Sequence, residues 1–105
     1  MDSASNVAFS LGELRFEWDA NKSRINHQKH RVPFRIAAKV FLDPDRVEAL
    51  DDREDYGEDR FWVVGQVESR LIHVVYTERG DTVRIISARK ADSHEQAEYH
   101  RRRTI

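Results

Sequence analysis

The chain has 105 residues, no cysteine and a formal net charge of −1. This length predicts one domain with one modest hydrophobic core, and the lack of cysteine excludes disulfides, thiolate nucleophiles and cysteine-ligated metal sites. The same lack of cysteine makes a reducing cytoplasm the expected location, and no apolar run approaches the roughly 20 residues of a membrane-spanning helix.

The first strand signal lies in residues 14–18, whose weak alternation predicts a short strand with Phe16 turned inward. The residues before it lack the basic and apolar regions of a signal peptide. We therefore interpret residues 1–13 as a mobile leader and residues 14–105 as a single domain.

Two helices are expected next. Asp19 is a suitable cap for a helix over residues 20–30, which has so few apolar residues that it should lie at the periphery. The second helix, over residues 33–43, has apolar residues at helical spacing and should pack on the core. Pro44 follows it and is expected to end it.

The second half of the chain predicts a meander of strands and a final helix. Asp92 or Ser93 can cap that helix, which ends in a run of arginines where the helix dipole favours cations. The strands are expected at residues 46–50, 61–67, 71–77 and 83–88, with a tight turn at residues 79–81. The resulting order, β-α-α-β-β-β-β-α, is that of an α+β domain.

The charges are unevenly distributed. Residues 51–59 contain six acids and one base, whereas residues 84–103 are rich in arginine. The whole chain has 14 arginines and 4 lysines, and the planar guanidinium suits phosphates and stacks on bases. This composition favours RNA or a protein anion as partner, but the net charge gives no support for general nucleic-acid affinity.

Several classes of site are not indicated. The sequence contains no P-loop, no HExxH, no GxGxxG and no Ser-His-Asp spacing. His27 and His30 are three residues apart on the expected helix, but no further ligands follow at convincing spacing. Neither a metal site nor a cofactor is therefore expected.

Six short motifs, in this order and at this spacing, resemble the BrnT family of toxins from bacterial toxin–antitoxin pairs. The resemblance spans Phe16 to Tyr99. The motifs are FEWD at residues 16–19, NHQKH at 26–30, FRIAAKVFLDP at 34–44, DRF at 59–61, TERG at 77–80 and RIISARKA at 84–91.

The resemblance implies a fold and a function. The fold would be similar to that of RelE-type ribonucleases, a small and mostly antiparallel sheet with helices packed on one face. The activity would be that of an endoribonuclease that blocks translation by cleaving RNA, with ribosome-associated mRNA as one form of substrate. A cognate antitoxin of the BrnA type, with a ribbon-helix-helix pattern, would neutralise it in a hetero-oligomer and would alone contact operator DNA.

One position departs from the family pattern. The family usually has glycine after the Lys-His pair, and this chain has Arg31. If the backbone there is left-handed, a residue other than glycine costs about 1 kcal/mol.

A ribonuclease without a metal must activate the ribose 2′-hydroxyl, neutralise the scissile phosphate and protonate the leaving 5′-oxygen. Arginine forks serve the phosphate, and histidine, lysine, glutamate or tyrosine can move protons. On the family's motif positions, the expected catalytic residues are Lys29, His30, Arg60 and Arg89. The expected RNA contacts are Arg79, Arg84, Lys90 and Tyr99.

Each of these residues also has a purely structural interpretation. Lys29 and His30 can satisfy the dipole at the end of their helix. Arg60 can pair with a neighbouring acid, Glu58 or Asp59. On sequence alone, Arg79 is simply a solvated cation in the turn.

For the remaining candidates the alternation of a strand is informative. Arg84 and Arg89 are five residues apart and therefore lie on opposite faces of a regular strand. They can share a site only if the strand is bulged or Arg89 lies past its end, so the simpler view makes Arg89 the phosphate ligand and Arg84 a scaffold cation. Tyr99 can stack on a base but is more often a core residue, and His73 is expected to be a satisfied core or edge histidine.

Two other functions remain open at this level. The chain can be a catalytically inactive, toxin-like module that binds the antitoxin or RNA without cleavage. It can also be a plain RNA-binding domain, whose RNA retention would fall steeply with salt while the RNA stayed intact.

Overall fold

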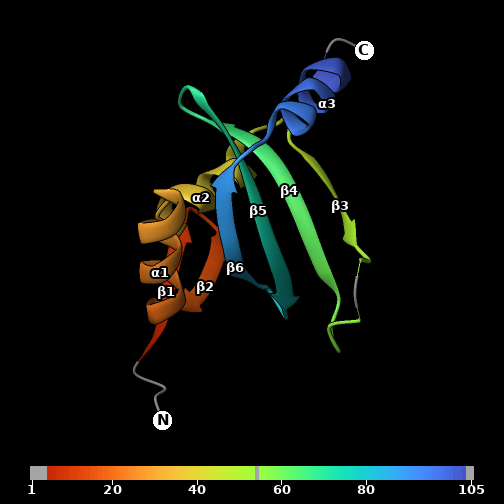
Figure 1. Ribbon diagram of the computed structural model, residues 1–105. Coiled ribbons are helices and arrows are strands. Elements are labelled where there is room, and N and C mark those ends of the chain that lie inside the picture. The colour runs from red at the N-terminus through yellow and green to blue at the C-terminus, as the bar shows by residue number, and fades with distance from the viewer. Residues whose placement is uncertain (1–4, 54, 104–105) are drawn as a thin grey trace.

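The computed structural model describes residues 5–53 and 55–103. Its centre is one six-stranded sheet in the order β1-β2-β6-β5-β4-β3 (Figure 1). Neighbouring strands are antiparallel except for β2 and β6, which run parallel. The α+β class is confirmed. The elements are β1 (Asn6–Leu11), β2 (Leu14–Asp19), α1 (Ala20–His30), α2 (Phe34–Ala37), the 3-10 helix η2 (Ala38–Leu42), β3 (Val47–Asp51), β4 (Arg60–Val67), β5 (Arg70–Arg79), β6 (Thr82–Lys90) and α3 (Ser93–Arg103).

The expectation of a mobile leader over residues 1–13 is corrected. Within residues 1–13, Asn6–Leu11 forms strand β1, which pairs with β2 at the edge of the sheet. Val7, Phe9 and Leu11 alternate along it and pack against the core. This strand is stable because β2 is beside it, and such pairing cannot be read from a six-residue polar–apolar pattern alone. Residues 1–4 of the expected leader lie outside the described residues.

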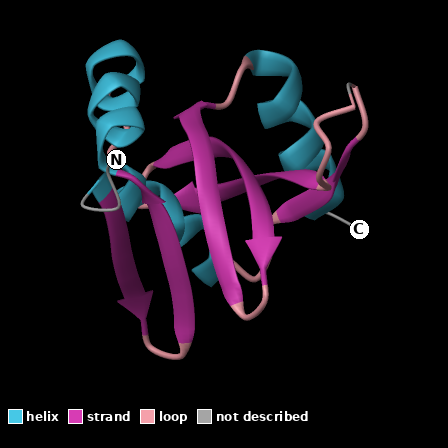
Figure 2. Ribbon diagram, turned by 90° about the horizontal axis from the view of Figure 1, so that it is seen from below, coloured by secondary structure: helices cyan, strands magenta, loops and turns pink. Residues whose placement is uncertain are grey.

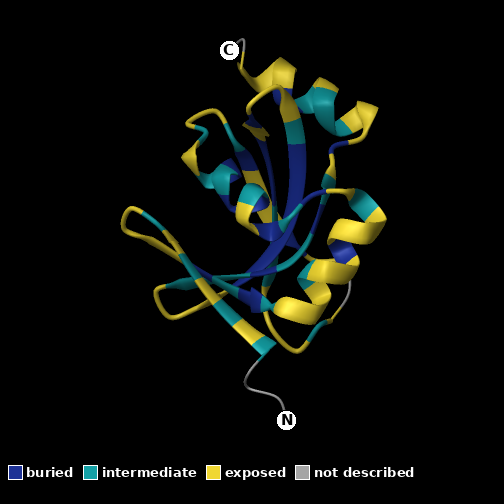
Figure 3. Ribbon diagram, turned by 90° about the vertical axis from the view of Figure 1, so that its left-hand side faces the viewer, coloured by how far each residue is buried: buried dark blue, intermediate teal, exposed yellow. Residues whose placement is uncertain are grey.

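One face of the sheet, here called the core face, carries the main hydrophobic cluster beneath α2 and η2 (Figure 3). Phe34, Ala37 and Val40 are all fully buried against it. The expected helix over residues 33–43 is thus present in two pieces, a short α-helix and a 3-10 helix. The backbone of β4 comes so close here that a Cβ at Gly65 would lie 3.0 Å from the side chain of Val40.

Helix α1 is peripheral, as expected, and Asn26 is its one buried residue (Figure 3). Asp19 caps it by accepting hydrogen bonds from the backbone N–H groups of Asn21 and Lys22. The Asn26 amide donates to the carbonyl of Ala88 at 2.8 Å and accepts from its N–H at 3.2 Å. A side chain thereby takes the place of a neighbouring strand on β6 and anchors a helix that has almost no apolar face.

Helix α1 ends in a strained conformation. Arg31 has φ 62° and ψ 28°, the left-handed region, and its N–H donates to the carbonyl of His27. The sequence departure at this position therefore has the expected backbone consequence. Because glycine adopts this conformation without a Cβ penalty, Arg31→Gly is expected to raise the free energy of unfolding by about 1 kcal/mol. Urea denaturation of the two proteins measures it.

A matched control separates this effect from a general response to glycine. Gln28 is exposed in the interior of α1, where glycine costs about 1 kcal/mol relative to a good helix former. Gln28→Gly should therefore destabilise the protein while Arg31→Gly stabilises it. Equal destabilisation by both variants would contradict the strain assigned to Arg31.

The expectation that the helices pack on one face is also corrected, because α3 lies on the other. Val63 points to the core face, whereas its neighbour Val64 packs with Tyr99 of α3 in a second hydrophobic cluster. We call this second side the open face, since α3 covers only one end of it. Figure 2 shows α3 at the opposite end of the molecule from the β1–β2 hairpin.

Candidate active site

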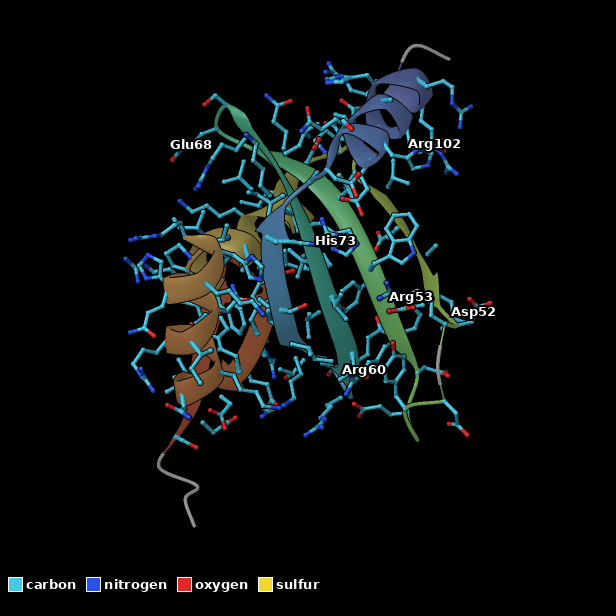
Figure 4. The ribbon with its side chains drawn as sticks, viewed as in Figure 1. Asp52, Arg53, Arg60, Glu68, His73 and Arg102 are labelled. Carbon is cyan, nitrogen blue, oxygen red and sulfur yellow. The ribbon has the colours of Figure 1, made fainter. Side chains whose placement is uncertain are left out.

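A groove of about 380 Å³ lies between α3 and the open face of the sheet. Figure 4 shows His73 and Arg53 on this face below α3, which carries Arg102, while Arg60 lies toward the other end of the sheet. The groove thus joins side chains from β3, β4, β5, β6 and α3. Its lining residues are Val47, Leu50, Asp51, Asp52, Arg53, Trp62, Val64, His73, Arg89, His94, Glu95, Glu98, Tyr99 and Arg102.

Glu95 lines the groove and binds Arg89. Its two oxygens accept a fork of hydrogen bonds from Arg89, both at 2.9 Å. Glu95 also exchanges hydrogen bonds with Asp92, in which each residue's backbone N–H donates to the other's carboxylate, the reciprocal cap of a helix N-terminus. The first turn of α3 and the guanidinium of Arg89 are therefore fixed by one carboxylate.

These contacts change the acidity of the partners. Burial opposes ionisation of Glu95, but the hydrogen bonds from Arg89 and Asp92 outweigh it and hold its pKa below the usual range. The hydrogen bonds to Glu95 likewise raise the pKa of Arg89. Both groups are charged at neutral pH, so the groove contains a fixed guanidinium whose fork is partly occupied.

His73 lies opposite Arg89 in the register of β5 and β6. Its Nε2 is 3.6 Å from a Glu95 oxygen, and its ring stacks on Trp62 with centroids 6.1 Å apart and planes 16° apart. Burial, with a smaller contribution from Arg89, lowers the pKa of His73 in spite of Glu95. The imidazole is therefore neutral at pH 7 and able to accept a proton.

The other two arginines of the groove are also paired. Arg53 forks onto Asp51 with both distances 2.8 Å, and this pairing lowers the pKa of Asp51. Arg102 donates to Glu98 at 2.7 Å. The Arg53 and Arg102 side chains remain 71% and 56% exposed, and exposed pairs contribute only about 0–1 kcal/mol. A phosphate can compete for Arg102 at little cost, whereas displacing Arg53 would leave Asp51, whose side chain is only 1% exposed, without its partner.

A second group of arginines forms a chain of ion pairs at the other end of the open face. Arg84 donates to Glu17 at 2.8 Å, and Arg79 bridges Glu17 at 4.0 Å and Glu58 at 3.6 Å. Arg60 then lies 3.6 Å from Glu58. The acids of this chain come from β2 and from the loop before β4, so the expected ion pair between Arg60 and a neighbouring acid is present.

Arg60 is unusual within that chain. Its guanidinium carbon lies 4.2 Å from the centroid of the Tyr56 ring, and its Nε is a buried nitrogen with no hydrogen-bond partner among the described residues. Thr77, beside it, donates its hydroxyl to the carbonyl of Asp59. Arg60 is thus held by stacking and charge and keeps one N–H donor uncommitted.

A β-bulge overturns the expectation that Arg84 and Arg89 point to opposite faces. Val75 pairs with Ser87, but the next residue of β5, Tyr76, pairs with Ile85. The residue in between is extra and shifts the alternation by one, so both arginines lie on the open face. They are still about 15 Å apart along the strand at about 3.3 Å per residue, and belong to the two separate groups described above.

The structure does not bring all the predicted residues together. Lys29 and His30 end α1 and do not line the groove. Lys90 is exposed at the end of β6, where its carbonyl accepts from Arg89. Tyr99 lines the groove but is only 1% exposed.

Tyr99 is therefore placed as a core residue and not as a base-stacking one. Its hydroxyl donates to Asp43 at 2.6 Å. Burial and this bond raise the pKa of Tyr99 to about 12, so the hydroxyl stays protonated. Stacking on a base would require the ring to leave the second hydrophobic cluster.

Sequence reasoning missed Trp62, Arg53, His94 and Glu95 as members of a site. Trp62 and His73 follow the apolar alternation of their strands, which is equally typical of a core. The reciprocal pattern of Asp92 and Glu95, an acid three residues after a capping acid, was a usable signal for the start of α3. Nothing local in the sequence indicates that this start lies over Arg89.

Two features are absent from the described ranges, 5–53 and 55–103. No helix there is long and apolar enough to span a membrane. No group of three or more histidine or acidic side chains there is arranged to hold a metal ion.

Comparison with known proteins identifies a family. No curated protein matches the chain. Residues 18–95 match the family model described as "Ribonuclease toxin, BrnT, of type II toxin-antitoxin system". The matched range includes Arg53, Trp62, His73, Arg89 and Glu95, and it ends one turn into α3. More than half of the chain is covered, so this protein belongs to the BrnT family of ribonuclease toxins from type II toxin–antitoxin systems.

Proposed function

We propose that this chain is itself an endoribonuclease that cleaves RNA without a metal ion, and that the groove beneath α3 is its active site. The observation that carries the proposal is the pairing of His73 with Arg89 across β5 and β6. A neutral imidazole and a fixed guanidinium lie side by side there, and they are the proton acceptor and the phosphate ligand that the reaction requires.

The chemistry follows from these positions. His73 takes the proton of the 2′-hydroxyl, and the resulting oxygen attacks the adjacent phosphorus. Arg89 donates to the non-bridging oxygens, whose charge increases in the transition state. His94, which lines the same groove from α3, is placed to give a proton to the departing 5′-oxygen. The products are a 2′,3′-cyclic phosphate and a 5′-hydroxyl.

The proposal revises the roles expected from the sequence. Arg89 remains the phosphate ligand, whereas proton transfer passes from Lys29 and His30 to the two histidines of the groove. Arg60, Arg79 and Arg84 would contact the RNA on one side of the cleaved bond, toward the other end of the open face. Lys90 would contact it at the rim.

The partners and the wider fold belong to the same proposal. Family membership implies an antitoxin partner and an RNA substrate. We propose that the antitoxin is of the BrnA type, that it alone contacts operator DNA, and that the fold is RelE-like. The mixed sheet with its open face supports a RelE-like arrangement, although α3 lies on the side opposite α2.

The test is to incubate the purified protein with a synthetic RNA in the presence of EDTA and to identify the ends of the products. Cyclic or 3′ phosphates that form at an unchanged rate in EDTA are the expected result. Intact RNA under conditions in which the RNA is bound would favour the inactive binding module instead. Cleavage abolished by EDTA and restored by a divalent ion would contradict the metal-free mechanism.

A further inference from the structure

Trp62 occupies a position on the open face that the mechanism above does not explain. It is only partly buried and lines the groove. The other tryptophan of the chain, Trp18, is 6% exposed in the main core. Burying an aromatic ring is among the larger contributions that a side chain makes to stability, so an indole that stays accessible on the surface of a groove is available for another contact.

The cross-strand neighbours of Trp62 have small side chains. In the register of the sheet, Trp62 lies between Ala49 on β3 and Val75 on β5, and Ser87 on β6 follows Val75 in the same row. These three side chains are small, and Trp62 remains partly exposed beside them. Trp62 makes a parallel ring contact with His73, which places the indole next to the proposed proton acceptor.

Cations flank the indole on both sides. Along β4, Arg60 lies two residues away on the same face, about 7 Å along the strand. On the other side, Arg89 lies across from His73, and Arg53 reaches into the groove from beyond β3. An aromatic platform between arginines is the arrangement that holds single-stranded nucleic acid, because the ring stacks on a base while the guanidinium groups contact the phosphates.

We propose that Trp62 is the stacking platform for one nucleobase of a single-stranded RNA, that of a nucleotide bordering the cleaved bond. The inference rests on the proposed function, because it places the base relative to His73 and Arg89. A stacked base fixes the ribose beside His73 and brings the phosphate onto Arg89. Trp62 therefore acts in substrate binding and orientation, and every base can use it since each has a π-face.

Fluorescence tests the contact without requiring cleavage. Trp18 and Trp62 are the two tryptophans of the chain, so Trp18→Phe leaves Trp62 as the single indole. Addition of a 2′-O-methyl oligonucleotide, which cannot be cleaved through its 2′-oxygen, is expected to quench this protein. Trp62→Phe, which retains only the buried Trp18, should not be quenched by the same oligonucleotide.

Affinity supplies the second measurement. Trp62→Leu keeps an apolar side chain and removes the π-face, and it is expected to weaken oligonucleotide binding roughly 5- to 150-fold. Trp62→Phe should restore most of the binding. Leu42→Ala, at an apolar residue that is 58% exposed outside the groove, should leave binding unchanged. Thermal unfolding of each variant establishes that it is folded.

The outcomes separate this inference from the proposed function. Unquenched Trp62 in a protein that cleaves RNA, or equal affinity of Trp62→Leu and the parent, would overturn the base platform and leave the nuclease standing. Quenching by the non-cleavable strand in a protein that never cleaves RNA would confirm the platform and overturn the nuclease.

Discussion

Replacing Arg89 with alanine is expected to lower RNA cleavage by roughly 100- to 1000-fold, the usual effect of removing one donor to a developing oxyanion. Growth arrest on expression should be lost with it. The physical reason is that Arg89 is the one guanidinium placed directly across from His73 in the described part of the sheet. Single-turnover cleavage of a synthetic RNA measures the effect.

The competing explanation is that Arg89 serves only to fasten α3 through Glu95. Glu95→Gln weakens the same pair and should lower the free energy of unfolding about as much as Arg89→Ala does. If the fastening alone mattered, the two variants would lose activity equally. We expect Glu95→Gln to remain at least about tenfold more active than Arg89→Ala, because the Arg89 guanidinium is still present to bind the phosphate.

A charge-matched control is available on the same protein. Arg70 is exposed at the start of β5 and does not line the groove. Arg70→Ala removes the same charge as Arg89→Ala but should leave the cleavage rate nearly unchanged. A similar loss in both would mean that cleavage depends on overall charge and not on Arg89.

Replacing His73 with glutamine is expected to lower the cleavage rate by roughly 100- to 10,000-fold, the range for loss of a positioned general base. The replacement is polar and uncharged, as the buried imidazole is at neutral pH. His27→Gln serves as the control, because His27 is an exposed histidine on α1 outside the groove. Its cleavage rate should match that of the parent.

The pH profile distinguishes a base from a residue that merely fills space. The pKa of His73 is lowered from 6.5 by burial, so protonation, which abolishes its function as a base, occurs only below pH 6.5. The cleavage rate should therefore stay constant as pH is lowered to 6.5 and should decrease below the pKa of His73. In His73→Gln this acid limb should be absent, and its persistence would assign the limb to another group.

Titration of His73 also makes the stability of the protein depend on pH. Because the pKa of His73 is lower in the folded than in the unfolded chain, the unfolded chain binds the proton more tightly. The contribution of His73 to stability is therefore complete above the pKa that His73 has in the unfolded chain. It is lost as pH falls through the lower pKa that His73 has in the folded chain. Asp43 and Asp51, whose pKa values are also lowered, add a further loss at more acidic pH.

The features that the sequence predicted well are local ones. The start of α1 follows from the Asp19 cap, and the meander of β4, β5 and β6 follows from alternation and from tight turns such as that at Gly80. These signals depend on residues within a few positions of one another. The peripheral position of α1 could be predicted as well, because a helix without an apolar face cannot lie in the core.

The features that were missed depend on distant contacts. Strand β1 is held by its pairing with β2, and α3 is directed to the open face by Tyr99 and its cluster with Val47 and Val64. The site shows the same division. Arg89 could be named from a motif, whereas Trp62 and His73 are indistinguishable from core residues until the sheet shows which face lies under α3.

The bulge in β6 has a consequence for the spacing of the chain. With the extra residue, Arg84 reaches Glu17 and Arg89 reaches Glu95 from one side of the sheet. On a regular strand the same five-residue spacing would turn one guanidinium into the apolar layer beneath α2, where an unpaired charge is very costly. In this segment the bulge is thus as much a part of the site as the residue identities, because it lets two arginines at an odd spacing share one face.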